Sequence, residues 1–164
     1  MKNWNATDFF ARLTRTNRLA KSKGFVFRSV SGLEGFEDAL GSLQTAPALV
    51  CVSDISQGYT RINNTPHTRR VKTVYLAMRH ALDDARAREE SMDTLREVFR
   101  QFMSALLPER TRINEGYIYL DERIAFNEID RYFFSGCACA FFQISIDIYT
   151  DLQHREEEWT EEVE

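Results

Sequence analysis

Glycine, proline and cysteine are all scarce in this sequence. Its 164 residues include seven Gly, three Pro and three Cys. So few glycines and prolines exclude a collagen-like or loop-dominated chain and argue against disorder. Three cysteines do not make an even set, so a small scaffold held together by disulfides is also excluded.

Long apolar runs are missing as well. No stretch approaches the ~18 consecutive apolar residues that are needed to cross a bilayer. The first ten residues, MKNWNATDFF, lack the apolar region of a signal peptide. We therefore expect no membrane partner and an intracellular, reducing location.

The apolar residues that are present suffice for one folded domain. They make up 43% of the chain, enough for a proper core at this length. We predict a single domain over residues 1–152, followed by an acidic C-terminal tail over residues 153–164.

Charge is distributed unevenly along the chain. Residues 1–30 contain seven Lys or Arg side chains and one acidic residue, Asp8, which gives a local net charge of +6. Residues 156–164, EEEWTEEVE, contain six Glu. Such polarity is common on a solvated surface, and it also suits head-to-tail association or contact with a polyanion.

Apolar residues at helical spacing predict three helices. They cover residues 4–20, 31–43 and 88–107. The first is basic. The third has the clearest apolar stripe, and Pro108 is expected to end it because proline disrupts a helix interior.

Two further segments have the character of strands. Residues 48–55, ALVCVSDI, form a short apolar run, which indicates a buried strand. Residues 69–80 include a clear alternation of apolar and polar positions, which indicates a half-buried strand. Residues 56–68 between them contain Gly, Asn and Pro and are predicted to be a long polar connection.

The clearest alternation lies near the C-terminus. Over residues 137–150 the even-numbered positions up to 148 are Ala, Phe or Ile, while the odd-numbered positions are mixed. This pattern predicts a strand with a firmly set register. Short strand pieces are expected at 116–120 and 123–126. The element order predicts an α+β fold, with helices packed on one face of a mainly antiparallel sheet.

Two sets of candidate contact residues follow from these patterns. Phe141, Gln143 and Tyr149 lie on the mixed face of the last strand and are candidates for a subunit interface. Long loops are often functional, and basic side chains bind polyanions. The candidate basic contact residues of the polar connection and the first helix are Arg61, Arg69, Arg70, Arg12, Arg15 and Arg18.

No pattern typical of an enzyme is present. The sequence has no Gly-x-Ser-x-Gly, His-Glu-x-x-His or Gly-rich phosphate loop. Cys137 and Cys139 lack the usual zinc spacing and are interpreted as buried apolar residues. The carboxylates between residues 121 and 130 alternate with arginines and are interpreted as solvated charge. We therefore expect no catalytic residues, no metal and no cofactor.

The order of elements resembles the tail terminator, or tail-completion, proteins of tailed phages. The stretches that carry the resemblance are 48–55, 69–80, 88–107 and FFQISIDIYTDL at 141–152. The resemblance implies a ring of identical subunits, expected to be a hexamer, that caps the tail tube and joins it to the head connector. It implies that DNA passes through the ring, and that the protein occurs in the host cytoplasm and the assembled virion tail.

Two other functions remain open from the sequence alone. A stand-alone nucleic-acid- or ligand-binding domain would use the basic first helix and would bind with salt-sensitive affinity. An enzyme whose site leaves no linear signature would have a deep pocket with convergent titrating groups.

Overall fold

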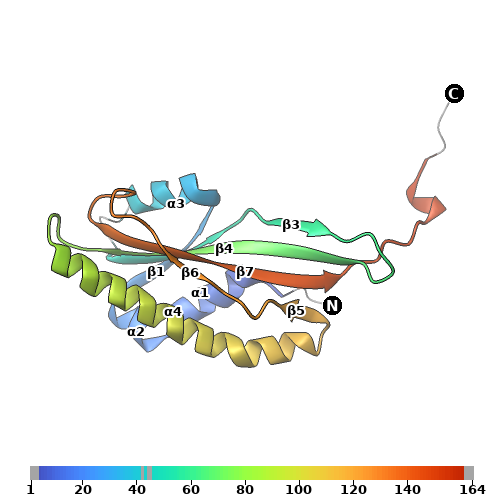
Figure 1. Ribbon diagram of the computed structural model, residues 1–164, viewed down its shortest axis with the longest axis horizontal. Coiled ribbons are helices and arrows are strands. Elements are labelled where there is room, and N and C mark those ends of the chain that lie inside the picture. Colours follow the sequence, from blue (N-terminus) through green and yellow to red (C-terminus); the bar gives the residue numbers. More distant parts are fainter. Residues whose placement is uncertain (1–3, 42, 44–45, 161–164) are drawn as a thin grey trace.

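A seven-stranded mixed sheet forms the centre of the computed structural model, which describes residues 4–41, 43 and 46–160 (Figure 1). The main strand order is β1-β2-β4-β7-β5, while β3 pairs with β4 and β6 with β7. The strands are β1 (Phe25–Val30), β2 (Ala48–Ser53), β3 (Gln57–Thr60), β4 (His67–Arg79), β5 (Ile118–Leu120), β6 (Phe126–Glu128) and β7 (Cys137–Tyr149). Within the described residues only β1 and β2 run parallel, so the predicted α+β fold with a mainly antiparallel sheet is confirmed.

The two longest strands, β4 and β7, run along the whole sheet. They pair antiparallel from His67 opposite Tyr149 to Arg79 opposite Cys137. Alternate side chains project to opposite faces, and Phe142, Ile144 and their even-numbered neighbours are buried as the alternation predicts.

Three helices cover the even-numbered face of these strands. They are α1 (Ala6–Thr16), α2 (Arg18–Ser22) and α4 (Ala85–Asn114), which lie together below the sheet in Figure 1. The rings of Phe10, Phe102 and Phe142 meet in this core, with centroid distances of 5.9 Å from Phe10 to Phe102 and 5.5 Å from Phe10 to Phe142.

The remaining long helix, α3 (Gly32–Gly41), lies on the opposite face, so the helices do not all share one side as expected. Its Phe36 ring stacks on Tyr75 of β4 at 4.5 Å. Odd-numbered residues of β4 and β7 are apolar at this end of the sheet and form a second core with α3. An apolar stretch on both faces requires a cover on both faces.

The basic helix expected over residues 4–20 is two helices. Asn17 has extended backbone geometry and separates α1 from α2. Its side-chain oxygen accepts a hydrogen bond from the backbone N–H of Ala20 at 2.8 Å, and its amide group donates one to Gln101 of α4. Asparagine is a favoured N-cap, and this cap starts the second helix.

Pro108 does not end α4, which continues to Asn114 and curves along its length (Figure 1). A proline inside a helix costs roughly 3 kcal/mol. Packing offsets that cost here, because Leu106 and Ile113 on either side of Pro108 are both buried against the sheet core. The prediction of a helix end at residue 107 was therefore wrong.

The predicted polar connection over residues 56–68 is largely a β-hairpin. β3 pairs with the first half of β4, and both elements extend past the part of the sheet that α3 covers (Figure 1). Gly58 makes this pairing possible, because a Cβ atom there would lie 1.8 Å from the carbonyl oxygen of Arg69. All four residues of β3 are exposed, so no buried face marks the strand in the sequence.

The C-terminal tail leaves the body at the end of β7 and projects away from it (Figure 1). It contains a short 3-10 helix, Glu156–Glu158. Residues 161–164 of the expected tail lie outside the described residues, as does Lys2 of the basic N-terminal stretch.

Candidate functional site

A large part of the odd-numbered sheet face has no helix over it. α3 covers β1, β2 and the C-terminal half of β4. The N-terminal half of β4, with β3 beside it, and the C-terminal half of β7, with β5 beside it, have no helix over this face. We define this uncovered region, with the adjoining start of α3, as the open face. It is lined by Leu33, Ile55, Gln57, Tyr59, Val71, Thr73, Tyr119, Phe141, Gln143 and Tyr149.

A shallow groove of about 320 Å³ lies in the open face beside the first turn of α3. Leu33 and Ile55 border it and are 51% and 55% exposed, high values for large apolar side chains. Phe141 and Gln143, two of the predicted interface residues, line the same groove. Exposed apolar side chains that gather around a groove are typical of an interaction surface.

A row of aromatic and charged side chains crosses the open face beyond the groove. The register places Tyr59 of β3 beside Arg69 of β4, Arg69 beside Asp147 of β7, and Asp147 beside Tyr119 of β5. The guanidinium of Arg69 donates two hydrogen bonds to the Asp147 carboxylate, at 2.9 and 2.7 Å, and a third to Asp121 at 3.2 Å.

This network neutralises Arg69. The hydrogen bonds from Arg69 lower the pKa of Asp147, and those to Asp147 raise the pKa of the guanidinium. The side chains of Arg69 and Asp147 are 27% and 31% exposed, so solvent still screens the pair. The row therefore presents two tyrosines, Tyr59 and Tyr119, on either side of a fixed ion pair, and it has little net charge.

Tyr149, the third predicted interface residue, ends β7 beside the hairpin. Its ring packs edge-on against His67 at 6.0 Å, and His67 also contacts Tyr119 at 6.2 Å. Phe141, Gln143 and Tyr149 thus share one face, as predicted, with Tyr149 farther along the strand than the other two.

The three predicted basic residues of the hairpin do not form one basic surface. Arg69 is paired on the open face, Arg70 is exposed on the other face, and Arg61 lies over the Tyr59 ring at 5.7 Å. Alternation along β4 separates Arg69 from Arg70.

The sequence analysis did not predict four residues of the open face, namely Leu33, Ile55, Tyr59 and Tyr119. Among them only Tyr59 had a signal in the sequence, because the Gln-x-Tyr alternation at 57–59 is compatible with a strand.

The predicted basic residues of the first helix are all exposed. Arg12 and Arg15 lie on the outer side of α1, and Arg18 begins α2. Within the described part of the chain none of these three side chains forms an ion pair.

A second apolar groove lies on the opposite side of the molecule. It has a volume of about 600 Å³ and runs between α4 and the chain that joins β5 to β6. Its lining is mainly apolar, and Leu107 at its rim is 66% exposed. The lining residues include Phe99, Met103, Leu106, Leu107, Leu120 and Ile124. We call it the α4 groove.

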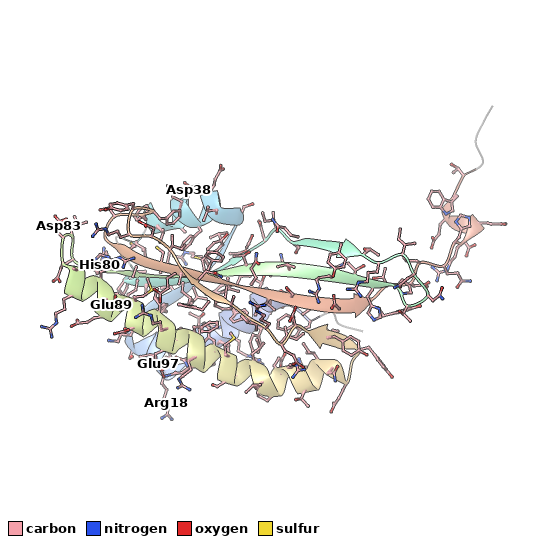
Figure 2. The ribbon with its side chains drawn as sticks, viewed as in Figure 1. Arg18, Asp38, His80, Asp83, Glu89 and Glu97 are labelled. Atoms are coloured by element: carbon pink, nitrogen blue, oxygen red, sulfur yellow. The ribbon has the colours of Figure 1, made fainter. Side chains whose placement is uncertain are left out.

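A third hollow, at the end of the sheet away from the tail, gathers several titratable side chains, and Nε of Arg88 is buried there without a hydrogen-bond partner among the described residues. His80 and Asp83 lie at this end (Figure 2). His80 Nδ1 contacts the Ala81 carbonyl, and Asp84 accepts the hydrogen bond that caps α4.

The three cysteines lie inside the second core. All are buried and unpaired, and burial raises the pKa of Cys51 to about 12 and the pKa of Cys139 in the same direction. A thiol is a ligand or nucleophile only as the thiolate. In the part of the chain that the structure describes, no group of three or more His, Cys, Asp and Glu side chains is arranged to hold a metal ion.

No protein-family model matches the chain, and no curated protein matches it significantly. Among the helices within the described ranges, none combines the length and apolar character needed to span a bilayer.

Proposed function

We propose that this chain is a structural assembly subunit, a phage or prophage tail terminator whose copies form a closed ring at the end of the tail tube. The observation that carries the proposal is a pair of unlike apolar surfaces on opposite faces of one molecule, the open face and the α4 groove. Head-to-tail contacts between identical subunits need two different patches, and they close into a ring when the rotation between neighbours allows it.

The occupant of each surface is then a second copy of this chain. The open face has Phe141, Gln143 and Tyr149 on a rigid 13-residue strand, which suits a contact whose geometry must repeat around a ring. Aromatic side chains at the centre of such a contact contribute a large share of binding energy. A hexamer is the expected ring, with the tail tube and head connector as partners and DNA passing through its centre.

The proposal assigns no catalytic residue, cofactor or metal. It places the protein in the host cytoplasm during assembly and in the virion tail afterwards. Its function would be to end tube growth and present a docking face, both of which depend on interface geometry.

Two charge-inserting variants test the two surfaces separately. Leu33→Asp places a charge in the open face, and Asp is compatible with the first turn of α3 because it complements the helix dipole. Leu107→Asp does the same at the α4 groove. Leu82→Asp changes an equally exposed leucine outside both surfaces and serves as the control.

Native mass from light scattering after size exclusion measures the outcome. We expect a discrete oligomer for the wild type and Leu82→Asp, and monomers for each of the other two variants. A mixture of Leu33→Asp and Leu107→Asp should form dimers that grow no further, because each variant keeps one intact patch. A monomeric wild type at every concentration, or a ring unaffected by both variants, would refute the proposal.

The second candidate, a stand-alone nucleic-acid-binding domain, is favoured by the exposed cations of α1 and α2. It predicts salt-sensitive binding of an oligonucleotide by a monomer or dimer. Loss of that binding in Arg15→Glu with Arg18→Glu, in a protein that forms no larger oligomer, would support this candidate over the ring.

A further inference from the structure

The basic residues near the N-terminus form no ion pair with the described acidic side chains. Five exposed cations lie on α1, α2 and the turn after α2. They are Arg12, Arg15, Arg18, Lys21 and Lys23. Within the described residues none of them takes part in an ion pair. We call this set the basic surface.

Two neighbouring carboxylates of α4 are already paired. Glu97 and Glu109 of α4 are bound to Arg100 and Arg112 of the same helix. Asp8 is the acidic residue on α1 itself. The charge of the basic surface therefore remains available to a partner outside the folded body, and such a partner must be anionic.

The tail has the complementary composition. The stretch 156–164 contains six Glu, and in the described part Glu156 and Glu157 form no ion pair. Trp159 is 68% exposed, and its ring stacks on His154 of the tail itself, at 5.7 Å. Exposed tryptophan beside carboxylates has the character of a binding peptide, because Trp both buries apolar area and accepts a cation over its ring.

The two charged elements point away from each other in one molecule. The tail leaves the body at the hairpin end of β7 (Figure 1), whereas Arg18 extends outward on the far side of the helical layer (Figure 2). Arg155 links the tail's own Asp151 and Glu158, which stiffens its first turn. This placement favours contact between copies over contact within one copy.

We propose that the C-terminal segment 156–160 of one copy binds the basic surface of the next, with Glu156 and Glu157 against its arginines and Trp159 over an arginine or the aliphatic part of a lysine. This inference rests on the proposed assembly of copies and supplies a second contact between neighbours. The tail would act as a strap that lengthens residence in the ring, since a second contact linked to the first makes rebinding intramolecular. Its charge complementarity would also speed encounter and set register.

Tryptophan fluorescence of the full chain tests the strap directly. The chain has two Trp, and Trp4→Phe leaves Trp159 as the sole reporter. We expect its emission to shift to the blue, and its quenching by acrylamide to fall, as protein concentration rises. Added salt should reverse both changes, because screening weakens exposed charge pairs.

Charge exchange provides the specific control. Arg15→Glu with Arg18→Glu should weaken the concentration-dependent change by about tenfold or more, which equals at least about 1.4 kcal/mol. Arg123→Glu alters another exposed, unpaired arginine outside the basic surface and should leave it unchanged. The double variant Glu156→Lys with Glu157→Lys should lose the concentration-dependent shielding of Trp159. The shielding should return when these two changes are combined with Arg15→Glu and Arg18→Glu.

The outcomes separate this inference from the ring itself. A ring by light scattering with Trp159 exposed at every concentration overturns the strap and leaves the proposed function standing. A shielded Trp159 that is independent of concentration means docking within one copy and also overturns it. If Arg15→Glu with Arg18→Glu abolishes oligonucleotide binding while Trp159 stays exposed at every concentration, the basic surface binds nucleic acid and the strap is overturned. The strap is supported if Trp159 becomes shielded with rising concentration, if either pair of charge reversals abolishes that shielding, and if the two pairs together restore it. This holds even if Leu33→Asp leaves the native mass of the oligomer unchanged.

Discussion

Replacing Phe10 with alanine tests whether α1 belongs to the core or is a detachable basic arm. Phe10 is fully buried, and its ring contacts Phe102 of α4 and Phe142 of β7 as well as Phe9. Truncation of a buried Phe to Ala costs about 3–5 kcal/mol through lost transfer energy and the cavity left behind. That is a large part of the ~5–15 kcal/mol by which a domain is stable.

Urea unfolding followed by circular dichroism measures the loss. We expect the midpoint to fall with little change in the slope, because the variant changes stability without changing the surface exposed on unfolding. The corresponding drop in melting temperature is about 6–20 °C, at roughly 2–4 °C per kcal/mol for a chain of this size. Tyr132→Ala, at a side chain that is 79% exposed, is the control and should stay within about 0.5 kcal/mol of the wild type.

A double-mutant cycle isolates the ring contact. Phe10→Leu and Phe142→Leu should couple by about 0.5–1.5 kcal/mol, the usual value for an aromatic pair. A loss below about 1 kcal/mol for Phe10→Ala, or additive leucine variants, would show that α1 does not pack as described. The basic surface would then lie on a mobile arm.

Two further predictions concern titration. Asp147→Asn should destabilise the fold at neutral pH by less than about 1 kcal/mol, since the pair with Arg69 is partly exposed. Arg69 lowers the folded-state pKa of Asp147, so its contribution is complete above the unfolded pKa of about 3.9 and is lost as pH falls through the lower folded value. Urea titrations at several pH values should show the difference shrinking below pH ~4, and a constant difference down to pH ~2 would contradict the mechanism. Burial raises the pKa of Cys51 to about 12 and shields the other two thiols, so a disulfide reagent at mildly alkaline pH should react with all three only after unfolding. Reaction of any one of them in the native protein at the rate of a free thiol would contradict their burial.

The strands with one buried face could be predicted from the sequence because their pattern repeats every second residue. The alternation over 137–150 identified β7 and both of its faces. β2 is buried on both faces, and its continuous apolar run at 48–55 identified it instead. β3 could not be found in this way. All its residues are exposed, and its pairing depends on the close approach of Gly58 to β4.

Other features depend on contacts between distant residues. α4 continues past Pro108 because Leu106 and Ile113 are buried in the core. Helix propensity depends only on the local sequence, so it could not predict this continuation. The charge of Arg69 is neutralised by carboxylates 52 and 78 residues further along the chain. The three predicted interface residues needed only the alternation of one strand, so their shared face could be predicted, whereas the surrounding open face could not.

The central position of β7 has a consequence for how the protein is made. β7 follows every other described strand in the chain, yet it lies between β4 and β5 and also pairs with β6. During translation, β4 therefore waits with an unpaired edge while α4 is synthesised, and only the arrival of β7 completes the sheet. Unpaired edges invite association with other chains. A ribosome that stalls before residue 137 would leave a nascent chain open to aggregation and chaperone capture, and completion of the sheet would commit each copy to the folded state.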